Sequence, residues 1–148
     1  MQGIMDSFES SYEATPDAVA RVRADLAAFA AGHGMHACRV DDLRLAVSEA
    51  VTNAVLHAYR GAGGTVHVTA RLDDGALWVS VRDFGAGMHP RGFVAGRSGM
   101  GLGLALLGRI AGELSIVAPA GGGTELRMRF ELMPAPLRGK RRPVAASA

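Results

Sequence analysis

Apolar and polar residues alternate along the chain with two different periods, and each period predicts a different kind of element. A short first strand is expected over residues 8–12, followed by a helix over 15–34 with Pro16 in its first position. The apolar face of that helix repeats at helical spacing: Val19, Val22, Leu26 and Phe29. A second helix is expected over 41–59, with two adjacent aspartates near its start.

The period then changes to two, which is typical of strands. Residues 65–72 and 76–83 both alternate, and Asp74-Gly75 between them suits a tight turn, so this region predicts a β-hairpin. After a glycine-rich stretch, one more helix and two more strands are expected over 103–112, 113–118 and 124–132.

This order of elements predicts an α+β fold. Strands follow one another in hairpins and helices gather elsewhere, which indicates a two-layer sandwich. We expect a mixed, mainly antiparallel β-sheet with about three helices on one face. A doubly wound parallel sheet would need strands and helices to alternate regularly, and they do not.

Composition and charge narrow the class of protein. Hydrophobic residues make up 49% of the chain and charged residues 20%, as in an ordinary globular domain, and no apolar run reaches the roughly 18–20 residues of a membrane helix. Residues 134–148 hold four basic residues and no acidic one, whereas residues 1–133 hold 12 basic and 14 acidic residues, a formal charge of −2. We therefore expect one domain over 7–133, a basic disordered tail over 134–148, and no direct nucleic-acid or membrane partner.

Two further observations concern the compartment. The first ten residues lack the basic start and apolar core of a signal peptide. Cys38 is the only cysteine, so the chain has no internal disulfide. Both observations favour a cytoplasmic protein.

A polar stripe interrupts the mainly apolar second helix. Glu49, Asn53 and His57 are spaced four residues apart, so they are expected to be neighbours on one face, about 6 Å apart along the axis. A solvated helix face would explain them, but such faces usually carry lysine, arginine and glutamate. A carboxylate beside a carboxamide suits a hard cation such as Mg²⁺, or a carboxylate base next to one. A lone histidine near a helix end is more often structural.

The glycine-rich stretch excludes the common nucleotide-binding loops. Lys140 in the tail is the only lysine, so neither a P-loop nor a protein-kinase strand lysine is possible. Gly99, Gly101 and Gly103 follow a loop rather than a strand, which argues against a dinucleotide-binding Rossmann turn.

What remains is an anion site built from backbone N–H groups at a helix start, which needs no lysine. Arg97 directly before it can add a guanidinium to a terminal phosphate. Upstream, Asp83 ends a strand and is followed by Gly85 and Gly87. A carboxylate there can accept a hydrogen bond from an amino group such as that of adenine, and the glycines let a ring lie against the backbone. Either glycine cluster alone would be read as an ordinary turn.

Four segments together are characteristic of a known family: EAVTNAVLHAY (49–59), DFGAG (83–87), RSGMGLGLALL (97–107) and GGGTELRMRF (121–130). They resemble the four sequence boxes of the GHKL ATPase superfamily, to which histidine kinases and gyrase-type ATPases belong. Within it the chain looks most like the bacterial anti-sigma-factor serine kinases.

The resemblance implies roles for individual residues. Glu49 would be the general base, Asn53 would ligate Mg²⁺, and Asp83 would hold the adenine amino group with support from Thr124. Gly85 and Gly87 would line the adenine ring, and residues 84–98 would form a lid over the nucleotide. The phosphates would be bound by the residues at the end of this lid and the start of the next helix: Arg97, Gly99, Met100, Gly101, Leu102 and Gly103.

The resemblance also implies a function with ATP and Mg²⁺ as cofactors. Such kinases transfer the γ-phosphate of ATP to a serine of an anti-sigma antagonist protein and bind a sigma factor, commonly as a homodimer. Two alternatives stay open: a nucleotide-binding partner-switching module without kinase activity, and a stand-alone histidine-kinase-type catalytic domain. Glu49 favours the enzyme, because a pure binding module would not need a base.

Overall fold

The computed structural model describes residues 6–59, 63–85 and 100–134. Within these ranges the elements in chain order are β1 (Ser7–Glu13), α1 (Pro16–Gly32), α2 (Ala37–Asn53), a π-helical turn η1 (Ala54–Ala58), β2 (Thr65–Asp73), β3 (Ala76–Asp83), α3 (Met100–Ile110), β4 (Glu113–Val117) and β5 (Thr124–Glu131). The lid expected over 84–98 and the tail expected over 134–148 lie almost wholly outside the described residues.

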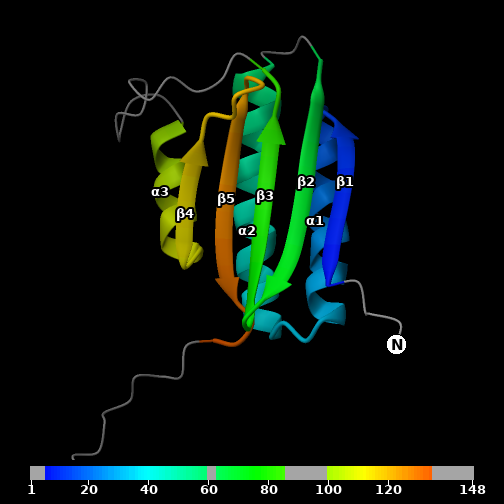
Figure 1. The fold of residues 1–148 in the computed structure, drawn as a ribbon, viewed down its shortest axis with the longest axis vertical. Helices are drawn as coiled ribbons and strands as arrows, with labels where there is room; N and C mark the ends of the chain where they lie inside the picture. The colour runs from blue at the N-terminus through cyan, green and yellow to red at the C-terminus, as the bar shows by residue number, and fades with distance from the viewer. Residues whose placement is uncertain (1–5, 60–62, 86–99, 135–148) are drawn as a thin grey trace, which may run out of the picture.

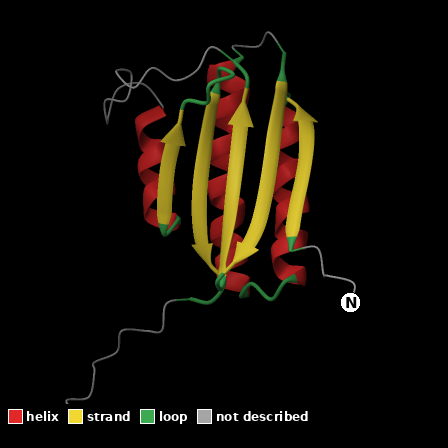
Figure 2. Ribbon diagram, viewed as in Figure 1, coloured by secondary structure: helices red, strands yellow, loops and turns green. Residues whose placement is uncertain are grey.

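The five strands form one sheet in the order β1-β2-β3-β5-β4, and each described pairing is antiparallel. The α-helices of the described ranges, α1, α2 and α3, lie behind this sheet, and no described element covers its other face (Figure 1). Coloured by secondary structure, the same view shows one layer of strands and one layer of helices (Figure 2). The expected α+β two-layer sandwich is therefore confirmed.

The core lies between the two layers. Buried residues alternate along the central strands β2, β3 and β5, as the period of two predicts. They meet apolar side chains of α1 and α2, and the largest fully buried ones include Phe130, Leu26, Leu43, Leu77 and Met128. Replacing one such leucine by alanine would lower the free energy of unfolding by about 2–5 kcal/mol. This core fixes the ends of the elements that carry the candidate site.

The β-hairpin prediction is confirmed in detail. β2 and β3 are paired from Asp73↔Ala76 outward, and Asp74 and Gly75 between them both have positive φ, at 49° and 73°. Positive φ at both central residues is the requirement of the tight turn that matches the twist of the strands. The strand bounds agree with the expected ones to within one residue.

The expected start of the second helix near Asp41 or Asp42 was wrong. α2 begins at Ala37, because His36 acts as its N-cap and its Nδ1 accepts a hydrogen bond from the backbone N–H of Cys38 at 3.2 Å. Both aspartates lie inside the helix, where each forms an ion pair with an arginine three residues away. Aspartate is a common N-cap and histidine is not, so the sequence pattern pointed to the wrong residue.

Two other helix ends also differ from expectation. The regular α-helix of α2 ends at Asn53, and the chain continues to Ala58 as a π-helical turn, a feature frequent at functional sites. α3 begins at Met100 rather than at 103, because glycine lowers helix propensity by only about 1 kcal/mol and does not prevent a helix start. None of the helices in the described ranges is both long and apolar enough to cross a lipid bilayer.

Candidate functional site

The elements that carry the described candidate site residues meet at one end of the molecule. At the upper end in Figure 1, α2 and β3 finish and β5 and α3 begin. Glu49 and Asn53 lie on the last two turns of α2, Asp83 is the last residue of β3, and Thr124 is the first residue of β5. Segments far apart in the sequence thus converge on one region, as the four sequence boxes imply.

Asp83 is a buried carboxylate that accepts two backbone hydrogen bonds. It is only 7% exposed and pairs with Thr124 across the β3–β5 ladder. Its Oδ1 accepts hydrogen bonds from the backbone N–H groups of Gly85 at 3.1 Å and Thr124 at 3.2 Å. Both of these hydrogen bonds go to Oδ1 and neither to Oδ2. The carboxylate can therefore accept a further hydrogen bond from a ligand.

Burial dominates the ionisation of Asp83. Removal from water raises the pKa of this carboxyl above its usual value of 3.8, and the two backbone hydrogen bonds and nearby Arg82 offset only part of that effect. A buried carboxyl with a perturbed pKa is a mark of a functional site, although structural networks produce it too.

The glycine run before β5 has a steric explanation. Gly123 has φ +79°, a conformation that residues with a side chain rarely adopt. A Cβ atom on Gly123 would overlap the backbone carbonyl of Asp83. The turn at Gly122 and Gly123 therefore lies directly against the backbone of Asp83, so the position requires glycine.

Asn53 carries the clearest sign of a missing partner. Its side chain is half-buried, and its Nδ2 atom is buried with no hydrogen-bond partner in the described part of the chain. Leaving such a group unpaired costs about 1–3 kcal/mol, so a polar ligand at this position would satisfy it. An amide offers an oxygen that can ligate a cation and a nitrogen that can donate to a phosphate. The residue therefore fits a site for Mg²⁺ and a nucleotide.

Glu49 lies one helical turn before Asn53, on the same face and half-buried. In the described ranges, no three histidine, cysteine, aspartate or glutamate side chains gather closely enough to hold a metal. The candidate metal ligand expected from the sequence is the Asn53 amide, with Glu49 beside it on the same helix face.

Two residues of the expected phosphate site, Arg97 and Gly99, lie outside the described residues, as does Gly87 of the expected adenine site. Met100, Gly101, Leu102 and Gly103 form the first turn of α3, where backbone N–H groups have no intrahelical partner. These four residues therefore lie at a helix start, which favours an anion.

Sequence reasoning missed Tyr59, the residue that follows η1. Its hydroxyl accepts a hydrogen bond from the backbone N–H of Phe84 at 2.7 Å and donates one to the carbonyl of Thr65 at 2.6 Å. Phe84 directly follows Asp83, so Tyr59 contacts the backbone next to this candidate site residue. The tyrosine is part of a family-like motif, but no local pattern reveals contacts over such a sequence separation.

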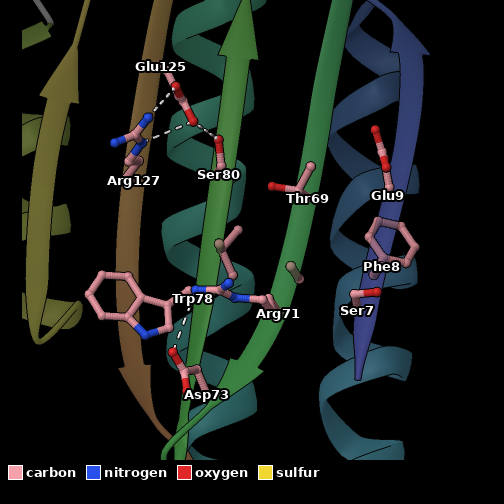
Figure 3. Close-up of a pocket in the computed structure, with 12 residues that line it drawn as sticks. Ser7, Phe8, Glu9, Thr69, Arg71, Asp73, Trp78, Ser80, Glu125 and Arg127 are labelled. Carbon is pink, nitrogen blue, oxygen red and sulfur yellow. Dashed lines mark hydrogen bonds and ion pairs between the residues drawn. The ribbon is translucent and has the colours of Figure 1, made fainter. Parts of the chain in front are cut away.

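A shallow hollow of about 560 Å³ lies on the uncovered face of the sheet, across β1, β2, β3 and β5 (Figure 3). Its wall includes Trp78 and a polar group in which Ser80 and Arg127 both donate to Glu125. The hydrogen bonds from Arg127 hold the pKa of Glu125 below its usual value. No described site residue lines this hollow, so it is separate from the candidate site.

Comparison with known proteins defines the class. The family model for the histidine kinase-like ATPase domain matches residues 12–130. The chain therefore belongs to the histidine kinase-like ATPase domain family. The expected GHKL resemblance, with anti-sigma kinases as relatives, is confirmed.

Among curated relatives, an anti-sigma F factor of Clostridium acetobutylicum is 40% identical over 67 residues, which cover 45% of this chain and 47% of the relative. The serine-protein kinase RsbW of Bacillus licheniformis is 38% identical over 72 residues, 49% of this chain and 45% of the relative. The chain thus spans about half the length of these two relatives. An anti-sigma F factor of Caldanaerobacter subterraneus subsp. tengcongensis is 33% identical over 116 residues, 72% of this chain and 80% of the relative.

A solved structure is also similar to this chain. The structure of the RsbU and RsbW domains of Rv1364c from Mycobacterium tuberculosis matches with a TM-score of 0.66 and 29% identity. The match covers 84% of this chain and 32% of that one. The relatives are thus named as anti-sigma factors and as a serine-protein kinase, and the family model is that of an ATPase domain.

Proposed function

We propose that the protein is an ATP-dependent protein-serine kinase of the anti-sigma type. It transfers the γ-phosphate of ATP to a serine of an anti-sigma antagonist protein and also binds a sigma factor. The observation that carries the proposal is the arrangement of Glu49 and Asn53 on successive turns of α2, at the end of the molecule where Asp83 is buried. The serine-protein kinase among the relatives supports it.

Different residues of the proposed site bind the adenine base and the phosphates. Asp83 accepts a hydrogen bond from the adenine amino group through Oδ2, while Gly123 lets the turn before β5 pack against the Asp83 backbone. Thr124 supports Asp83, and Gly85 with Gly87 lines the base. The backbone N–H groups at the start of α3, with Arg97, hold the phosphates.

At the reacting end, Asn53 would ligate Mg²⁺, and Glu49 acts on the acceptor serine. Mg²⁺, when bound, neutralises charge on the phosphate oxygens. Glu49 accepts the proton of the serine hydroxyl as the serine oxygen forms a bond to the γ-phosphorus. The bond from that phosphorus to the β–γ bridging oxygen breaks, and ADP leaves with both electrons of that bond. Phosphoryl transfer needs mainly positioning and electrostatic stabilisation, which this set of groups supplies.

The competing function is a partner-switching module that binds nucleotide without transferring phosphate. The same Asp83 and Asn53 would serve it, and only Glu49 would be superfluous. The two functions therefore differ in one measurable step.

Phosphotransfer is the direct test. The purified chain is mixed with Mg-ATP and a panel of anti-sigma antagonist proteins, and phosphoserine is followed by mass spectrometry. We expect stoichiometric phosphorylation of one antagonist on a serine. ATP binding without phosphoserine on any antagonist would favour the partner-switching module, and phosphohistidine would favour a histidine-kinase-type domain.

Asn53→Ala tests the metal ligand. We expect the enhancement of ATP affinity by Mg²⁺ to fall on the order of tenfold, because the amide ligand is lost. Titration calorimetry with ATP in the presence of Mg²⁺ and of EDTA measures it. Ser48→Ala is the matched control, because Ser48 lies on the same helix and its hydroxyl is already satisfied by the Arg44 carbonyl at 2.7 Å. Equal Mg²⁺ enhancement in Asn53→Ala and the wild type would remove Asn53 from the metal site.

A further inference from the structure

Tyr59 joins three parts of the fold through one hydroxyl group. The residue caps the end of η1, which continues the helix that bears Glu49 and Asn53. The hydroxyl donates to the carbonyl of Thr65, the first residue of β2, at 2.6 Å. It accepts from the backbone N–H of Phe84, the residue after β3, at 2.7 Å. The end of the helix is thus bonded to the beginning of one central strand and to the end of the next.

The ring of Tyr59 is also fixed in place. A Cβ atom on Gly64 would overlap the ring at Cδ1, Cε1 and Cζ, so the aromatic face lies flat on the backbone just before β2. This packing does not involve the hydroxyl. The ring and the hydroxyl therefore have separable roles, and a phenylalanine at this position would keep the first and lose the second.

The turn that follows Asp83 is held from two sides. On one side, Asp83 Oδ1 accepts from the N–H groups of Gly85 and Thr124. On the other, Tyr59 holds the N–H of Phe84. Without the hydroxyl, the only hydrogen bonds from the described residues to this turn would be those of the carboxylate itself. The orientation of the Asp83 carboxylate depends on the backbone from which it extends, so Tyr59 acts on it through the Phe84 amide.

The geometry points to Tyr59 as a positioning residue for nucleotide recognition. Tyr59 keeps the turn that carries Asp83 in a fixed place relative to the helix that carries Glu49 and Asn53. The groups that bind adenine and those that bind the phosphates therefore keep one relative position. The inference rests on the proposed nucleotide site and names a residue that acts through Asp83 rather than on the ligand.

The experiment uses Tyr59→Phe in the full-length chain and has two arms. In the first, without nucleotide, amide hydrogen exchange is followed by NMR. The Phe84 amide is expected to lose protection by about tenfold, because one hydrogen bond holding it is removed. Exchange of the Phe84 amide at the wild-type rate would overturn the inference.

In the second arm, affinities for Mg-ATP and for Mg-tripolyphosphate are measured by calorimetry. Tripolyphosphate has the phosphate chain but no adenine. We expect Tyr59→Phe to weaken Mg-ATP binding about five- to tenfold and to leave Mg-tripolyphosphate binding unchanged. Equal weakening of both ligands would overturn the positioning role, because general loosening of the fold would then explain it.

Tyr12→Phe is the matched control, since Tyr12 is the only other tyrosine. Its buried hydroxyl donates to Asp25 at 2.6 Å, and burial together with that bond raises the pKa of Tyr12 to about 12. Tyr12 lies on β1, two strands from Asp83 in the same register of the sheet, but its hydroxyl is bonded to α1 rather than to the Asp83 turn. Its loss should change neither Phe84 exchange nor ATP affinity. Should Tyr12→Phe reproduce both effects, the inference fails.

The failure of this inference and that of the kinase proposal are distinguishable. A wild-type chain that binds ATP but phosphorylates no serine contradicts the kinase proposal, while the two arms above still support Tyr59. A wild-type chain that binds no ATP contradicts the nucleotide site, and with it the role of Tyr59 in recognition.

Discussion

Replacing Glu49 by glutamine is expected to slow phosphoryl transfer by about 10²- to 10⁴-fold while ATP still binds. Glutamine keeps the length and shape of the side chain on α2 but cannot take up the proton of an attacking hydroxyl. Asn53 and Asp83, the proposed ligands of the metal and of the adenine base, are untouched. The loss should therefore appear in the rate of phosphoserine formation under single-turnover conditions, with the Kd for Mg-ATP unchanged.

Glu113→Gln provides the control for this measurement. Glu113 is an exposed glutamate at the start of β4, at the end of α3 opposite to the site. The Glu113→Gln variant should transfer phosphate at the wild-type rate. A Glu49→Gln variant that does the same would show that Glu49 is not the base, and one that loses ATP binding to the same degree as transfer would indicate a structural role instead.

Asp83→Asn is expected to weaken ATP binding by about 10- to 100-fold. The asparagine oxygen can still accept from the N–H groups of Gly85 and Thr124, so the turn is preserved. The remaining atom becomes an NH₂ donor that faces the adenine amino group, another donor. Calorimetric titration with ATP measures the loss. Undiminished ATP affinity would mean that another group recognises the base.

The same substitution should not destabilise the protein at neutral pH. Burial raises the pKa of Asp83 in the folded state above its value in the unfolded chain. The native state therefore binds the proton more tightly, and the associated stability is fully present below the unfolded pKa and is lost as pH rises through the folded pKa. At neutral pH the ionised, buried carboxylate lowers the free energy of unfolding.

Thermal unfolding between pH 4 and 8 checks this sign. Asp83→Asn should be at least as stable as the wild type at pH 7, and its advantage should shrink as pH falls through the folded pKa of Asp83. An Asp83→Asn protein that is clearly less stable at pH 7 would show that the backbone hydrogen bonds outweigh the cost of burial.

The sequence predicted what local patterns encode. The hairpin at Asp74-Gly75 followed from turn chemistry, and the alternating strands followed from one buried face. Glu49 and Asn53 could be placed together because four residues are about one helical turn. The convergence of Asp83 and Thr124 with that helix came only through the family resemblance, since no local spacing brings residues 41 positions apart into register.

Other features depend on contacts that no local pattern contains. The start of α2 is set by the His36 side chain, which propensity ranks low as a cap. The need for glycine at position 123 comes from the Asp83 carbonyl in another strand. Tyr59 reaches the Phe84 amide across 25 residues of chain. Each is a tertiary contact, and tertiary contacts routinely override local preferences.

The uncovered face of the sheet has a practical consequence for spectroscopy. Trp78, the only tryptophan, lies on that face beside Arg129, whose guanidinium stands 5.9 Å from the ring centroid. The helix layer carrying Glu49 and Asn53 is on the other side (Figure 3). The intrinsic fluorescence of Trp78 should therefore change when the sheet unfolds and stay nearly constant when a nucleotide binds. Unfolding curves can be recorded at any ATP concentration without a ligand signal mixed into them.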